Sequence, residues 1–80
     1  MLETQLETKV LDLKGLLCPM PIVKMAKAIK EIEIGQTLEA YATDPGVMAD
    51  VPAWCRSTGH DLVTLEKVDK QFHFIVKRMK

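Results

Sequence analysis

The spacing of apolar residues changes between two periods along this chain, and this change constrains the fold more than any other feature. Residues 8–13 place Leu11 and Leu13 on one side and Val10 on the other, as a short strand does. Residues 21–32 then place apolar side chains on one helical face, and residues 37–43 alternate again. That helical face holds Ile22, Met25, Ala26, Ile29 and Ile32. A strand, helix and strand in this order favour two parallel strands joined by a right-handed crossover.

The second half of the chain predicts another helix and a hairpin. The Thr-Asp-Pro-Gly stretch at 43–46 favours a turn or helix start, capped by Asp44. Because Pro52 disfavours helical geometry in the residue before it, we expect a loose turn through Asp50 and a helix over about 51–58, ended by Gly59. Residues 61–68 and 71–79 are typical of strands joined by a two-residue turn.

The resulting βαβαββ order predicts an α/β (α+β) fold of one domain, spanning residues 1–80. Two helices are enough to cover one face of a four-stranded sheet, so we expect a two-layer sandwich with a mixed sheet and both helices on one face. Gly35 is expected to end the first helical region.

Composition excludes several classes of function. Eleven basic and eleven acidic residues give no net charge, so we expect no direct nucleic-acid binding. The longest uncharged stretch, residues 15–23, is too short to span a bilayer, so we expect a cytoplasmic protein without membrane attachment. Two cysteines and two histidines without a C-x-x-C motif indicate neither a disulfide framework nor a metal site.

The motif Cys18-Pro19-Met20-Pro21 stands where the first strand gives way to the first helix. Proline has no N–H, so it costs least in the first helical turn, and two prolines so close together stiffen the backbone. We expect the helix dipole and first-turn amides, such as those of Ile22 and Val23, to favour a thiolate on Cys18 and to lower its pKa. Pro21 occupies the place of a resolving cysteine, so sulfur loaded on Cys18 would stay there until a partner took it.

The stretch "LDLKGLLCPMPIVKMAKAI" resembles the TusA/SirA/YedF family of small sulfur-carrier proteins, whose mark is a C-P-x-P motif. Asp12, Gly15, Cys18 and Lys27, and the later "TDPGVMADVPAWCRSTGHDL", are similar to the family's pattern in the same order. The resemblance covers Val10 to the C-terminus. Lys14 stands where many members carry arginine, which would affect a partner contact rather than the sulfur chemistry.

The resemblance implies the same βαβαββ sandwich and a transient persulfide on the cysteine matching Cys18, with no resident cofactor. It implies a protein donor, either a cysteine desulfurase or a rhodanese-like protein, and a protein acceptor such as a DsrE-like relay protein. The family's downstream routes are tRNA thiolation, molybdenum cofactor assembly and sulfur oxidation, and the sequence does not select among them.

Other residues have two interpretations each. The basic residues Lys24, Lys27, Lys30 and Arg56 form either a partner-binding rim around Cys18 or a solvated helix face. Cys55 is expected to pack in the core rather than to act as a redox partner of Cys18. The histidines, His60 and His73, are expected to be structural or exposed. The methionines Met20, Met25, Met48 and Met79 are expected to fill gaps, with Met20 exposed at a docking surface.

Two functions of other classes stay open at this level. One is a non-catalytic regulatory or protein-interaction module with a structural, buried Cys18 that works through the basic helix face. The other is an RNA-binding α/β module, which few aromatic residues and the neutral charge disfavour.

Overall fold

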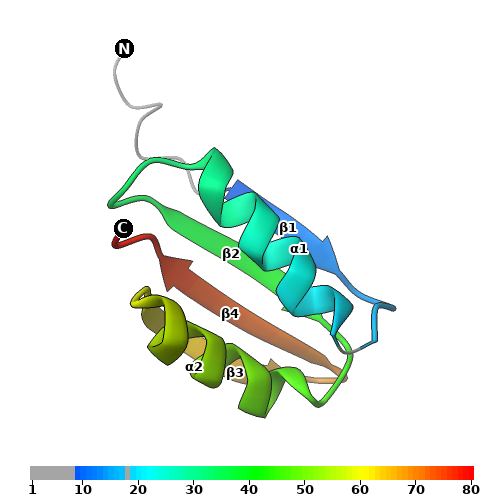
Figure 1. The fold of residues 1–80 in the computed structure, drawn as a ribbon. Coiled ribbons are helices and arrows are strands. Elements are labelled where there is room, and N and C mark those ends of the chain that lie inside the picture. The colour runs from blue at the N-terminus through cyan, green and yellow to red at the C-terminus, as the bar shows by residue number, and fades with distance from the viewer. Residues whose placement is uncertain (1–8, 18) are drawn as a thin grey trace.

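The computed structural model describes residues 9–17 and 19–80, and they show the predicted βαβαββ order with one unpredicted 3₁₀ turn after the first helix (Figure 1). The elements are β1 (Lys9–Leu13), α1 (Met20–Ala28), the 3₁₀ turn η2 (Ile29–Glu31), β2 (Thr37–Ala42), α2 (Val47–Thr58), β3 (Asp61–Val68) and β4 (Gln71–Lys77). No helix among the described residues is long and apolar enough to cross a membrane.

The four strands form one mixed sheet in the order β1-β2-β4-β3. β1 and β2 are parallel, as the crossover through α1 requires, and β4 is antiparallel to both of its neighbours. Both helices lie on one face of the sheet (Figure 1). The predicted two-layer sandwich is therefore confirmed, and no element among the described residues covers the other sheet face, which we call the uncovered face.

The core lies between the sheet and the two helices. Alternate residues of the central strands point into it, because successive side chains of a strand face opposite sides. The buried strand residues are Leu13 from β1, Leu38, Ala40 and Ala42 from β2, and Phe72, Phe74 and Val76 from β4. The buried apolar helix residues outside the first turn of α1 are Met25, Ala28, Ile29, Val47, Val51 and Cys55. No polar side chain of a described residue is buried.

The start of α2 was predicted wrongly. The helix begins at Val47 rather than near residue 51, and it runs through Pro52. Val47 and Val51 are both fully buried, one turn apart, so burial of this apolar face outweighs the backbone hydrogen bond that Pro52 cannot donate. Gly59 ends α2 as predicted, with φ of 86° and its amide bonded to the Cys55 carbonyl.

Smaller differences concern element ends and methionines. The first helical region stops at Glu31, because Ile32 is already extended, and β4 stops at Lys77. Met25 fills the core as expected, but Met48 and Met79 are exposed, so the gap-filling role predicted for these two is wrong.

Candidate functional site

The candidate site lies at the end of the sheet where β1 and β2 finish and where α1 and α2 both begin (Figure 1). Two loops form this end, one described at residues 14–17 and 19 and the other at residues 43–46. Parallel strands bring their carboxyl ends to the same edge, which places both loops side by side. Cys18 lies outside the described residues, so the site is built here from the residues on either side of it.

A direct hydrogen bond joins the two loops. The Gly15 amide donates to Thr43 Oγ1 at 2.9 Å, across 28 positions of sequence. The Lys14 amide donates to Asp12 Oδ1 at 3.0 Å, and Gly15 itself takes a positive φ of 83°. The loop that leads to Cys18 is therefore anchored at its first residues. The role of Thr43 was missed in the sequence, where only its place at a strand end before a turn could have indicated it.

The backbone after position 18 enters α1 at once. The Met20 amide donates to the Leu17 carbonyl at 2.8 Å, and the Val23 amide donates to the Pro19 carbonyl at 3.1 Å. Pro19 is the N-cap residue and Pro21 is in the first turn, where its missing N–H removes no helical bond. The expectation that Val23 offers a free amide is wrong, because this amide belongs to the helix. The positive end of the α1 dipole does lie at Pro19 and Met20, directly after position 18, and the first turn of the helix holds no acidic residue.

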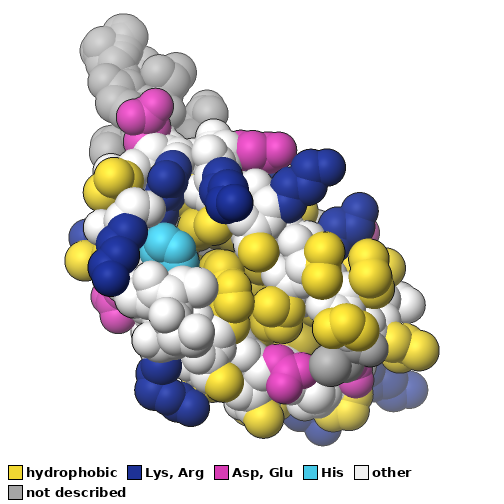
Figure 2. Space-filling model, in the orientation of Figure 1, with side chains coloured by type: hydrophobic (Ala, Val, Ile, Leu, Met, Phe, Trp, Pro, Cys, Tyr) yellow, Lys and Arg dark blue, Asp and Glu magenta, His cyan; other side chains and the backbone are white. Residues whose placement is uncertain are grey.

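Apolar side chains surround the start of α1. Leu17, Met20 and Val23 are between 42% and 72% exposed, and we call these three residues the apolar rim. Figure 2 shows hydrophobic side chains gathered on the surface over this end of the molecule. Pro21, in contrast, is fully buried, so it fixes the helix start against the core. The apolar rim is therefore a candidate contact surface beside the helix start.

The four basic residues of the sequence prediction do not gather at one place. Lys24 and Lys27 are exposed on α1. Lys30 lies in η2, beyond the far end of α1, and Arg56 lies in the last turn of α2. Both helices begin at the end of the sheet where the candidate site lies. Lys24 is therefore the nearest of the four to the site, and Lys30 and Arg56 lie at the opposite end.

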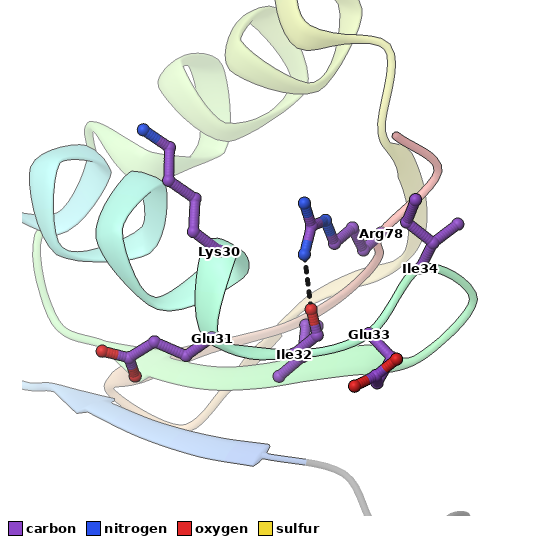
Figure 3. Close-up of a pocket in the computed structure, with 6 residues that line it drawn as sticks. All are labelled: Lys30, Glu31, Ile32, Glu33, Ile34 and Arg78. Atoms are coloured by element: carbon purple, nitrogen blue, oxygen red, sulfur yellow. Dashed lines mark hydrogen bonds between the residues drawn. The ribbon is translucent and has the colours of Figure 1, made fainter.

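Lys30 lines a shallow pocket of about 360 Å³ at that opposite end (Figure 3). The Arg78 guanidinium there donates through Nη1 to the Ile32 carbonyl at 2.5 Å and through Nε to the Lys80 carbonyl at 2.7 Å. Arg78 thus ties the chain just after η2 to the segment after β4. We assign it a structural role.

The second cysteine belongs to the core, as predicted. Cys55 is 4% exposed, and burial, with a smaller contribution from Asp61, raises the pKa of its thiol to about 11. No group of metal-binding residues occurs in the described part of the chain. His60 packs against Trp54, with ring centroids 5.5 Å apart, and its Nδ1 accepts a hydrogen bond from the Met79 amide.

Comparisons with known proteins agree with this architecture. The family model described as Sulfurtransferase TusA matches residues 9–78. The relative YrkI of Bacillus subtilis is 58% identical over 62 residues, 78% of this chain and 80% of its own length. The sulfur carrier protein TusA of Allochromatium vinosum is 38% identical over 68 residues, 85% of this chain and 90% of its own.

A solved structure supports the fold independently. The SirA-like protein of Desulfitobacterium hafniense superposes with a TM-score of 0.76 over 92% of this chain and 100% of its own, at 19% identity. Identity this low shows the fold alone, and the sequence matches show the family. The chain belongs to the TusA family of sulfur carrier proteins.

Proposed function

We propose that this protein carries sulfane sulfur as a persulfide on Cys18, between a protein donor and a protein acceptor in the cytoplasm. The observation that carries the proposal is the start of α1 at Met20, the second residue after Cys18. A helix N-terminus stabilises negative charge, and a thiolate is the attacking form of a cysteine. No neighbouring base is needed.

The transfer is an exchange between sulfur atoms without net oxidation. The Cys18 thiolate attacks the terminal sulfur of a donor persulfide, the donor's S–S bond breaks, and the donor cysteine leaves as a thiolate. Cys18 then holds the terminal sulfur. An acceptor thiolate attacks that sulfur in turn, and Cys18 leaves as a thiolate. Pro21 stands where a resolving cysteine would release the sulfur early, so only a partner completes the transfer.

The partners we propose follow from the apolar rim and the charge of α1. Helix α1 carries Lys24 and Lys27 and no acidic residue. A partner with an apolar recess and acidic residues beside its own reactive cysteine complements this surface. A cysteine desulfurase or rhodanese-like protein as donor, and a DsrE-like relay protein as one acceptor, are the classes that the family resemblance suggests. tRNA thiolation, molybdenum cofactor assembly and sulfur oxidation are the routes that such partners would serve.

Intact-protein mass spectrometry after incubation with polysulfide tests the sulfur chemistry. We expect the wild type and Cys55→Ala to gain ~32 Da, one sulfur atom, and Cys18→Ser to gain nothing. Alanine is the better control at position 55, because serine would place a hydroxyl in an apolar core. Reduction with dithiothreitol should remove the added mass.

Loading of Cys18→Ser to the wild-type level would disprove the assignment. A folded wild type that gains no mass with polysulfide or with a loaded desulfurase would also contradict it. That second result would favour the alternative, a regulatory interaction module in which Cys18 is structural.

A further inference from the structure

The uncovered face of the sheet carries a polar network at its centre. In β4, Phe72 and Phe74 point into the core, so the residue between them, His73, points to the opposite face. The strand register places His73 opposite Tyr41 of β2 and opposite Glu66 of β3. His73 therefore sits between both neighbouring strands.

Both ring nitrogens of His73 meet a carboxylate. Nε2 lies 2.6 Å from Glu39 Oε2, and Nδ1 lies 3.1 Å from Glu66 Oε2. The Tyr41 hydroxyl donates to the same Glu39 oxygen at 3.1 Å, and its ring lies 4.8 Å from the His73 ring, centroid to centroid. Ionised carboxylates only accept hydrogen bonds, so the two contacts together require a donor on each ring nitrogen. This geometry fits the imidazolium form of His73.

The surroundings of His73 favour the charged form. Burial alone would lower the pKa of His73, but its hydrogen bonds to Glu39 and Glu66 and their charges raise it above the ordinary histidine value. The hydrogen bond from His73 is also the largest cause of the lowered pKa of Glu39. Tyr41 is the other titratable group of β2 that faces the His73 ring. The neighbours of His73 on the same face of β4 are Gln71 and Ile75, and neither carries a charge.

We propose that Glu39, His73 and Glu66 form a proton-dependent clamp that holds the edge strand β3 to β4 and β2 across the uncovered face. A neutral imidazole donates through one nitrogen only. That proton stays on Nε2, because Nε2 makes the shorter contact and its partner Glu39 is less exposed than Glu66. Glu66, whose side chain is 54% exposed, then faces a lone pair on Nδ1 and turns to solvent. Loss of one proton therefore loosens β3 and leaves β2 paired with β4.

The direction of the pH dependence follows from the two groups. Because the pKa of His73 is raised in the folded protein, the clamp stabilises fully below the ordinary histidine pKa and is lost as the pH rises through the raised value. Because the pKa of Glu39 is lowered, its contribution is present above the ordinary glutamate pKa and is lost as the pH falls through the lowered value. The clamp thus acts between these two limits.

Amide hydrogen exchange, expressed as protection factors across about pH 5.5 to about pH 8.5, tests the clamp. We expect protection of the β3 amides to fall about fivefold as His73 loses its proton, which corresponds to one hydrogen bond, while α1 keeps its protection. Glu66→Gln should remove this pH dependence. Glu31→Gln is the matched control, because Glu31 pairs with Lys9 at 3.3 Å on exposed side chains away from β3.

An NMR titration of His73 in the same samples gives the second readout, and we expect its midpoint above the ordinary histidine value and lower in Glu66→Gln than in the wild type. Constant β3 protection through the His73 titration would overturn the proposal. So would a midpoint at or below the ordinary value, or a Glu31→Gln variant that loses the dependence equally. None of these measurements involves Cys18, so their outcome is independent of sulfur loading.

Discussion

The two cysteines illustrate how placement decides reactivity at the scale of the residue. Cys55 faces the core from α2 and has a pKa near 11, so at pH 8 only about a thousandth of it is thiolate. Helix α1 starts at Met20, two residues after Cys18, and we propose that this helix start favours the Cys18 thiolate. The same side chain is therefore inert in one place and, in our proposal, nucleophilic in the other.

Alkylation should separate the two thiols. With iodoacetamide at about pH 8, we expect one thiol per folded molecule to react quickly and the second to react only after denaturation in guanidinium. The Cys55→Ala variant should react once in either condition, and mass spectrometry counts the added groups. Equal reaction rates of both thiols in the folded wild type would contradict the burial of Cys55.

At this scale the sequence allowed some assignments and not others. The core position of Cys55 could be predicted because helical spacing puts it on one face with Val47 and Val51. The clamp could not, since Glu39, Glu66 and His73 are adjacent only when β4 lies between β2 and β3 in one register. Periodicity shows which face a strand residue takes and not which residue stands beside it.

At the scale of the element, α2 keeps a proline that weakens it. Pro52 lies inside the helix and cannot donate to the carbonyl one turn earlier, that of Met48. The sequence prediction began this helix too late, because the rule for residues before proline is local whereas the burial of Val47 depends on the sheet below. Helix and strand types were otherwise predictable, since their apolar periods differ clearly.

Replacing this proline should strengthen the helix. We expect Pro52→Ala to raise the free energy of unfolding by about 1–2 kcal/mol, the restored hydrogen bond being partly offset by a more flexible unfolded chain. Urea denaturation followed by circular dichroism measures the change. Pro45→Ala, in the turn before α2, should be neutral or slightly destabilising. A destabilised Pro52→Ala would show that packing of the proline ring outweighs the missing bond.

At the scale of the whole molecule, the single core makes the domain sensitive to truncation. Phe74 is fully buried at the middle of β4, opposite Ala40 on one side and Leu65 on the other. We expect Phe74→Ala to lower the free energy of unfolding by about 3–5 kcal/mol, a large part of the total for a domain of this size. Urea denaturation would show this as a lower midpoint or as loss of the folded baseline.

Val63 offers the matched comparison. It lies at the irregularity between Leu62 and Thr64 in β3 and is half exposed, so we expect Val63→Ala to cost less than about 1 kcal/mol. Similar losses from both substitutions would mean that β3 contributes more to the core than its exposure indicates.

The strand order has a consequence for how the protein is made. β4 pairs with both β2 and β3, yet it is the last strand of the described chain to be synthesised. While residues 71–77 are still inside the ribosome, β3 has no partner in the sheet, and the β1-β2 pair has one edge open. The sheet therefore closes only after β4 has left the ribosome, when this strand enters between two strands that are already outside.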